Sequence, residues 1–422
     1  MRSLLFCAAV VLTATTSWAG PAVDTVRVDL NPLIERASRT PSQFAVNVVH
    51  SASTSRQGVW SRQGTKSTWA YTVRVPTAIS MSFHAANVRL PSSAVLTVTA
   101  GSRSVRYASR DVGRSGIWGR PLPGDTLAFS LTVNTAQADQ VHVQLQSLQA
   151  GYRSLGEGVP DHPHFRELQR ASAAVAAGCT ENYECHVSAA NQGPSHATVV
   201  VLVEGLFQCT GTLVNDAAGD GIPYIVTARH CQTGQLGGGN PDVAADVSVY
   251  WDAVSACDTQ LGSIYSVATP SQTGGTTVLE QQDLWVIQLD TAPASNDAYY
   301  AGWDATGATF SGGYTIHHAL GLNQQYVQWS GTDILEKIPA TTLNIAYDSV
   351  YWGVVNGLGN VGAGASGSAL FSPNNLVVGS ASLAALTNGE NSAGVCPVSP
   401  PGIADLGVTA CWATKGSNTE RR

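Results

Sequence analysis

Short runs of Val, Thr and Leu alternate along this chain with turns rich in glycine and proline, and long amphipathic helical patterns are almost absent. Apolar runs of this length and composition are typical of β-strands. The pattern therefore predicts an all-β protein. With 422 residues, 42 of them glycine, the chain is long enough for two or three domains, each with a sizeable core.

The N-terminal part of the pattern predicts a compact β-sandwich of roughly 130 residues. Its strands are expected at the apolar runs 78–83, 94–98, 127–133 and 141–145. A connector over 152–177, polar and then alanine-rich, is expected to be exposed and open to proteolysis. The histidines of this region form no ligand cluster and are expected to be structural or at the surface: His84, His142, His162 and His164.

At the N-terminus, Arg2 and the apolar run 4–12 precede Ser17-Trp18-Ala19, which predicts a secretory signal peptide over residues 1–19. The run is too short to cross a membrane, and no later stretch approaches that length. We therefore expect an exported, soluble protein with no membrane partner, whose cysteines form disulfides. Seven cysteines remain after the signal peptide, all beyond residue 178, so one is left unpaired.

Charge is unevenly distributed over the chain. Residues 20–170 hold 16 Lys and Arg against 9 Asp and Glu, whereas residues 171–422 hold 5 against 20. Opposite net charges predict that the two segments dock on each other, although two ordinary solvated surfaces would give the same totals. The basic segment is short of lysine and carries no nucleic-acid motif, so we expect no nucleic-acid partner.

The stretch from Cys209 to Cys231 places a histidine directly after a predicted strand. Residues 213–214 and 224–226 fit two strands, and His230 follows the second one beside Cys231. A bond from Cys231 back to Cys209 would fix the imidazole, which is useful if the ring moves protons between two partners. The alternative is a partly buried structural histidine at a strand end.

Asp283 stands at the mouth of an apolar, strand-like run that extends to Leu289. A carboxylate there can accept a hydrogen bond from an imidazole N–H and favour the imidazolium. The alternative is a strand-edge aspartate satisfied by backbone N–H groups. Asp252 and Asp290 compete for the same role.

Ser366 lies between glycines in Gly364-Ala365-Ser366-Gly367. Glycines permit the backbone angles of a tight loop, and such a loop can aim the N–H groups of Gly364 and Ser366 at one point as an oxyanion hole. The four-residue motif alone is weak, and Ser368 and Ser380 are alternative nucleophiles.

Taken together, His230 in Thr-Ala-Arg-His-Cys, Asp283 and Ser366 resemble, in order and motif, the chymotrypsin-like serine endopeptidases. The resemblance implies a double β-barrel, two orthogonal six-stranded barrels with the site between them. It implies that Ser366 attacks the peptide carbonyl, His230 transfers the proton and Asp283 orients His230. No metal or organic cofactor is expected. His317-His318 looks like a metal pair, but adjacent residues on a strand point to opposite faces.

A closer resemblance, from Cys179 to about residue 410, is to the bacterial lysyl endopeptidase branch. It is carried by Cys179 and Cys185, the 22-residue gap from Cys209 to Cys231, Val249-Tyr250-Trp251, Ala301-Gly302-Trp303-Asp304, Ile316-His317-His318 and Gly-Ala-Ser-Gly-Ser around Ser366. The resemblance implies the disulfides Cys179–Cys396, Cys185–Cys257 and Cys209–Cys231, with Cys411 unpaired or replacing Cys396 as the partner of Cys179.

The branch also implies a secreted precursor. We expect a signal peptide over 1–19, a β-rich pro-domain with its linker over 20–170, a protease domain over 171–412 and a tail over 413–422. The pro-domain would serve as intramolecular chaperone and inhibitor, and cleavage after Arg170 would suit self-processing. Two alternatives stay open: the N-terminal domain is a permanent binding module, or the whole chain is a catalytically inactive, adhesive protease fold.

Substrate preference is predicted from a few positions. Six residues before Ser366, where trypsin-type enzymes carry their pocket aspartate, stands Asn360. The lysyl endopeptidase branch takes its carboxylate nine residues past a cysteine, which corresponds to Asp405 here, and carries a histidine that corresponds to Ser382. Asp405 could equally be a surface aspartate. Trp329 and Trp352 are candidates for a tryptophan that flanks the family's site. We expect protein or peptide substrates cut after Lys, or after Lys and Arg.

Overall fold

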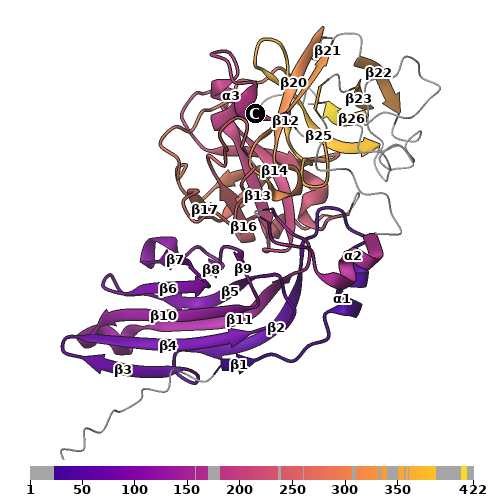
Figure 1. The fold of residues 1–422 in the computed structure, drawn as a ribbon. Helices are drawn as coiled ribbons and strands as arrows, with labels where there is room; N and C mark the ends of the chain where they lie inside the picture. The colour runs from indigo at the N-terminus through magenta and orange to yellow at the C-terminus, as the bar shows by residue number, and fades with distance from the viewer. Residues whose placement is uncertain are drawn as a thin grey trace, which may run out of the picture.

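The computed structural model describes residues 23–156, 158–169, 181–235, 239–259, 261–306, 310–330, 334–339, 350–355, 358–359, 361–385 and 410–415. The predicted signal peptide, Arg170, Asn360 and Asp405 lie outside these residues. The regular elements of the described part are mostly strands, with a few short helices, in an N-terminal and a C-terminal unit (Figure 1). The predicted all-β class is confirmed.

The N-terminal unit is a sandwich of two sheets that share one core. The larger sheet has the order β1 (Val23–Thr25), β4 (Lys66–Arg74), β10 (Thr126–Asn134), β6 (Val95–Ala100) and β7 (Arg103–Tyr107), with β3 (Val59–Gln63) also on β4. The smaller one has the order β2 (Ala45–Ser53), β11 (His142–Gly151), β5 (Ser80–Arg89) and β8 (Ile117–Trp118), with β9 (Leu122–Pro123) on β5.

Alternation along the strands explains how the sandwich closes. On β10, Leu127, Phe129, Leu131 and Val133 are buried while the residues between them are not, so one face of the sheet turns inward. These side chains share a core with buried residues of the second sheet, such as Phe83. The four predicted strands therefore fall on β5, β6, β10 and β11. Helices α1 (Asn31–Ala37) and α2 (Pro163–Gln169) flank this unit.

The C-terminal unit holds two antiparallel sheets. The first has the order β17 (Ser271–Thr273), β16 (Val247–Tyr250), β13 (Thr198–Val203), β14 (Phe207–Val214), β15 (Tyr224–Ala228), β19 (Leu284–Leu289) and β18 (Gly275–Gln281). The second has the order β12 (Glu181–Asn182), β21 (Gln325–Ser330), β20 (Gly312–His317), β24 (Ala369–Phe371), β25 (Val377–Ala385), β26 (Ala410–Lys415), β23 (Val350–Val355) and β22 (Ile334–Pro339).

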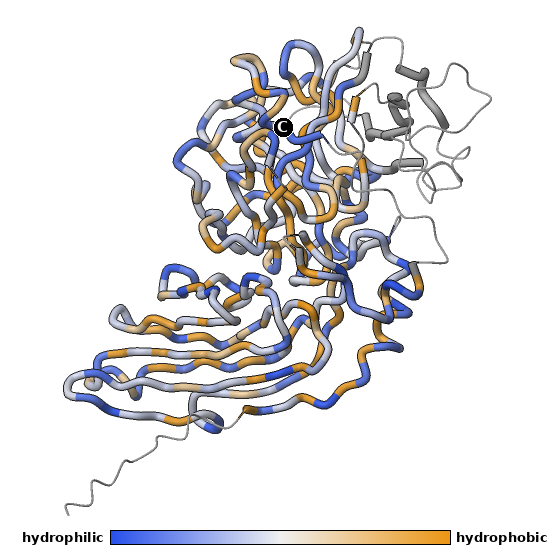
Figure 2. The backbone as a smooth tube through the Cα atoms, viewed as in Figure 1, coloured by the Kyte–Doolittle hydropathy of each residue, from blue (hydrophilic) through white to orange (hydrophobic). Residues whose placement is uncertain are grey.

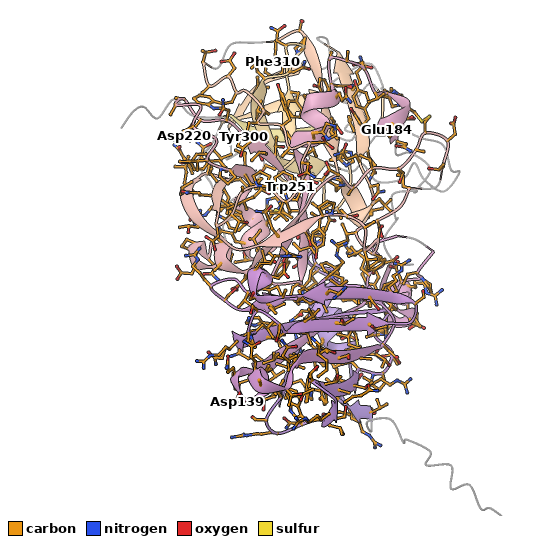
Figure 3. All side chains as sticks on the ribbon, turned by 90° about the vertical axis from the view of Figure 1, so that its left-hand side faces the viewer. Asp139, Glu184, Asp220, Trp251, Tyr300 and Phe310 are labelled. Carbon is orange, nitrogen blue, oxygen red and sulfur yellow. A yellow bond between two sulfur atoms is a disulfide. The ribbon has the colours of Figure 1, made fainter. Side chains whose placement is uncertain are left out.

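These two sheets share a core to which both contribute, as expected of the predicted double-barrel architecture. The strand number differs from six each, because short edge strands such as β12 and β17 extend the sheets to eight and seven strands. Trp251 is completely buried at the middle of this unit (Figure 3), and apolar stretches concentrate on its central strands (Figure 2). No helix among the described residues is long and apolar enough to cross a membrane.

The two units contact each other through residues of opposite charge, as their opposite net charges predict. Arg114 of the basic unit makes a two-point ion pair with Asp290 of the acidic unit, with Nε and Nη2 each 3.0 Å from a carboxylate oxygen. Trp118 adds a hydrogen bond from its indole N–H to Asp246, at 2.8 Å. The predicted docking of the two segments is confirmed.

Arg120 makes a deeply buried polar contact at this interface. Its side chain is 5% exposed, and its guanidinium lies 4.7 Å from the ring centroid of Tyr250. It donates hydrogen bonds to the backbone carbonyls of Ser266 and Thr269. The planar guanidinium, with its five N–H donors, can hydrogen-bond to carbonyls and stack on an aromatic ring at the same time. Arg120 therefore anchors the N-terminal unit on the loop before β17.

Candidate active site

His230 is placed by the end of β15 and by a disulfide. His230 lies in the short 3-10 helix that follows Ala228, and 8% of its surface is exposed. The next residue, Cys231, is bonded to Cys209 on β14, as predicted. The backbone on which the imidazole stands is therefore tied to two neighbouring strands.

Asp283 holds His230 at two points. Its Oδ2 accepts a hydrogen bond from Nδ1 of His230 at 2.8 Å, and its Oδ1 accepts the backbone N–H of His230 at 2.8 Å. The pairing of Ala228 with Leu284 in the β15–β19 ladder sets this register. Asp283 is wholly buried, so the contact lies in a low-dielectric environment. Among the described residues, Nε2 of His230 has no hydrogen-bond partner.

The two competing aspartates have other partners. Asp252 lies 3.4 Å from Nδ1 of His196, and Asp290 is paired with Arg114. Of the three aspartates that the sequence offers, Asp283 is the one that contacts His230.

The serine loop packs against the strands that carry His230. The backbone carbonyl of Ser366 accepts the N–H of Thr210 at 2.8 Å. Gly367 has φ +85°, and a Cβ on it would lie 2.2 Å from Oγ1 of Thr227 and 2.7 Å from the backbone nitrogen of Ala228. Only glycine fits this close approach, and it brings Ser366 beside the end of β15. Between the Ser366 hydroxyl and the imidazole there is no hydrogen bond in this structure.

Two backbone donors of this loop are left without a partner among the described residues. The N–H groups of Ala365, Gly367 and Ser368 donate to backbone carbonyls, whereas those of Gly364 and Ser366 donate to none. Gly364 has φ +93°. Both N–H groups are therefore available to a ligand, as the predicted oxyanion hole requires.

The alternative nucleophiles are enclosed. Ser368 is 0% exposed and Ser380 is 1% exposed. Neither hydroxyl has a hydrogen-bond partner among the described residues. Ser366, in contrast, is only half-buried.

Ser382 lies next to the carboxylate rather than on an open surface. It is 4% exposed, and its hydroxyl donates to Oδ2 of Asp283. The sequence suggested Ser382 as a substrate-binding residue; that role stays a prediction, and the contact observed here is with the residue that holds His230.

Gln208 and Thr210 support the serine loop, although neither belongs to a motif that predicts a catalytic role. The carbonyl of Gly364 accepts hydrogen bonds from Oγ1 of Thr210 at 2.8 Å and from Nε2 of Gln208 at 3.2 Å. Oε1 of Gln208 accepts the N–H of Gly321 at 3.1 Å. Their position on either side of Cys209 is the one hint that the sequence holds, because Cys209 is tied to the histidine turn.

The disulfides agree with prediction where they are described. Cys185–Cys257 and Cys209–Cys231 are both formed. Cys179 and Cys396 lie outside the described residues, and Cys411 lies on β26. Asp405, the predicted specificity residue, also lies outside them, and nothing is described of the side chains of Trp329 and Trp352.

The His317-His318 pair is buried rather than arranged for a metal. Nδ1 of His318 donates to the carbonyl of Leu322 at 2.9 Å, and Nδ1 of His317 accepts the N–H of Ala319 at 3.1 Å. Burial lowers the pKa of His318 to about 4. Both side chains are thus engaged with the local backbone.

A family model for the C-terminal domain of lysyl endopeptidase matches residues 173–395. The chain belongs to the lysyl endopeptidase family. The match begins close to the predicted boundary at residue 171 and covers the whole of the His230, Asp283 and Ser366 arrangement. The resemblance inferred from the motifs is confirmed.

Individual proteins of known name are similar to parts of this chain. The lysyl endopeptidase of Pseudomonas aeruginosa is 24% identical over 271 residues, which are 60% of this chain and 54% of that protein. The chain therefore spans about half the length of this curated relative. Among solved structures, the Rv3671c protease of M. tuberculosis in its active form has a TM-score of 0.31 at 15% identity, covering 53% of this chain and 79% of that one. A Glu endopeptidase has a TM-score of 0.32 at 17% identity, covering 55% and 90%.

Proposed function

We propose that this protein is a secreted serine endopeptidase that cuts polypeptides after Lys, or after Lys and Arg, through an acyl-enzyme. The observation that carries the proposal is the two-point contact of Asp283 with His230. It fixes which nitrogen of the imidazole carries the proton, so that Nε2 is left as the base. Membership of the lysyl endopeptidase family supports the reaction class.

In the proposed mechanism, Ser366 attacks the peptide carbonyl while His230 takes its proton. His230 then gives that proton to the leaving amine, and the acyl-enzyme is hydrolysed by water in the same way. Asp283 stabilises the imidazolium form of His230, which arises during acylation and again during deacylation. The N–H groups of Gly364 and Ser366 stabilise the oxyanion, and loss of one such donor typically costs about 10²- to 10³-fold in kcat.

Preference for a basic residue before the cut rests on Asp405 and on composition. A carboxylate in the substrate pocket can pair with a Lys or Arg side chain. Residues 171–422 contain only five basic residues, three of them within the last eight positions: Arg229, Lys337, Lys415, Arg421 and Arg422. A protease that cuts after basic residues gains from lacking them on its own surface.

The N-terminal unit is proposed to be a pro-domain that assists folding and inhibits the protease. Its basic charge and its buried Arg120 contact support a dedicated partnership with the acidic unit. The intact mass of the secreted protein tests this: a chain that begins near residue 171 is expected. A secreted chain that begins near residue 20 would mean a permanent binding module.

The reaction itself is tested by digesting a denatured protein of known sequence and reading the cut sites by mass spectrometry. Cuts after Lys, or after Lys and Arg, are expected, and Ser366→Ala should produce none. Cuts by the Ser366→Ala protein would refute the nucleophile, and no cuts by the wild-type protein would favour an inactive binding protein.

A further inference from the structure

Residues 40–44 of the N-terminal unit run antiparallel to the beginning of β14. The N–H of Phe44 donates to the carbonyl of Leu206 at 3.0 Å, and the N–H of Gln208 donates to the carbonyl of Ser42 at 2.8 Å. Gln43 and Phe207 form an antiparallel bridge between these contacts. The segment therefore adds a short strand to a backbone edge of the C-terminal unit, as an extended peptide does in β-augmentation.

This edge adjoins the proposed catalytic residues. Gln208 precedes Cys209, whose disulfide partner Cys231 follows His230, and the side chain of Gln208 supports the serine loop. The segment also reaches the chain beyond the histidine. A Cβ on Gly234 would lie only 2.3 Å from Cγ2 of Thr40, so Thr40 is packed against that turn.

The reaction chemistry decides which part of a substrate would use this side of the cleft. The histidine delivers its proton to the leaving amine, so the polypeptide downstream of the scissile bond leaves past the imidazole. Residues 40–44 lie against the strand that the Cys209–Cys231 disulfide ties to the His230 turn, and they occupy the N–H of Gln208 and the carbonyl of Leu206. An extended peptide would need the same two groups for strand pairing.

We propose that residues 40–44 form an inhibitory strand, which blocks the binding of substrate residues downstream of the scissile bond and leaves the acyl side of the cleft open. This inference rests on the proposed function and adds to it how the precursor is kept latent.

The N-terminal unit holds the inhibitory strand along its other edge as well. The N–H groups of Tyr152 and Arg153 donate to the carbonyl of Phe44 at 2.9 and 3.1 Å, and the Tyr152 hydroxyl donates to the carbonyl of Gln43 at 2.7 Å. The guanidinium of Arg153 donates to the carbonyl of Pro41. Because the strand is held from both sides, cleavage of the linker alone leaves it in place, and inhibition ends when the N-terminal unit dissociates or is digested.

The test compares two fluorogenic substrates on the intact full chain, its integrity verified by mass, and on the processed enzyme, from which the N-terminal unit has been cleaved and removed. One substrate is a lysyl aminocoumarin amide with no residue downstream. The other is a quenched peptide with the same acyl side and four downstream residues. Thr40→Trp adds bulk against Gly234, and Arg153→Ala removes the contact with Pro41; Thr65→Trp, on an exposed hairpin turn, is the matched control.

The intact wild-type chain is expected to hydrolyse the amide within about twofold of the processed enzyme and the quenched peptide at least tenfold more slowly. Thr40→Trp or Arg153→Ala should restore hydrolysis of the peptide, whereas Thr65→Trp should not. Two results would overturn the inhibitory strand while the proposed function stands. In one, the intact and the processed protein hydrolyse the quenched peptide at equal rates. In the other, the intact chain is slowed equally on both substrates. A processed protein inactive on both substrates would instead end the proposed function, and the inhibitory strand with it.

Discussion

The hydroxyl of Ser382 donates a hydrogen bond to Oδ2 of Asp283, the same oxygen that accepts Nδ1 of His230. Both contacts are buried, so the position of the carboxylate is fixed from two directions. In Ser382→Ala we expect kcat to fall about 10- to 150-fold with KM unchanged, because a hydrogen bond to a charged group contributes about 1.5–3 kcal/mol.

The matched control is Ser380→Ala, two residues earlier on β25, where the buried hydroxyl has no hydrogen-bond partner among the described residues. It should leave kcat unchanged. A rise in KM at constant kcat in Ser382→Ala would mean that Ser382 serves substrate binding, as the sequence suggested.

Asp283→Asn should be far more damaging than loss of Ser382. The amide keeps the size of the side chain but presents a donor to Nδ1, which favours the wrong tautomer of His230. We expect kcat to fall on the order of 10⁴-fold, measured with the lysyl amide on processed enzyme. Asp252→Asn, which changes the partner of His196, should stay within twofold of wild type. A comparable loss in both variants would argue against a specific role for Asp283.

The Arg120 contact should decide how tightly the two units hold together. Arg120→Ala leaves two carbonyls and the face of Tyr250 without their cation, and loss of such a buried contact typically costs 2–5 kcal/mol. We expect the N-terminal unit to dissociate from the linker-cleaved complex at least ~30-fold more readily, as measured by the dissociation constant. Arg110→Ala, at an exposed position, is the control and should change little. Equal affinities in wild type and Arg120→Ala would contradict the anchoring role.

Acid should destabilise the C-terminal unit through His318. Its pKa is about 4 in the folded protein, below the ordinary value of 6.5, because burial disfavours the charged ring. Between these values the unfolded chain binds a proton that the folded chain does not, so stability is lost as pH falls from 6.5 towards 4. The full effect is roughly 3 kcal/mol.

The measurement is the urea midpoint of the Ser366→Ala chain, which avoids self-digestion, between pH 7 and 4.5. His318→Gln should flatten the decline of the midpoint on acidification, whereas His142→Gln, on the partly exposed start of β11, should not. An unchanged decline in His318→Gln would assign the acid sensitivity to other groups.

The sequence predicted the parts of the site that are local in the chain. His230 after β15, Asp283 before β19 and Ser366 between glycines were all found from strand pattern and motif, since each depends on a few neighbouring residues. The docking of two oppositely charged units followed from the charge distribution, whereas the arrangement of the C-terminal sheets was implied by the family resemblance and not by local signals.

The supporting contacts could not be found in this way. Gln208 contacts a residue 156 positions away in the sequence, Ser382 one that is 99 positions away, and Arg120 one that is 149 positions away. Their roles therefore exist only once the sheets have formed. The same holds for residues 40–44, whose irregular sequence carries no strand pattern of its own and becomes extended by pairing on both edges. Long-range contacts of this kind depend on tertiary placement rather than on local propensity.

The central claim is that Ser366 is a nucleophile activated by His230. The most direct measurement is reaction of the processed protein with a serine-directed organophosphate, followed by peptide mapping of the adduct. The account predicts a single adduct on Ser366 that is absent from His230→Ala. No adduct, or an adduct on another serine such as Ser368, would contradict it.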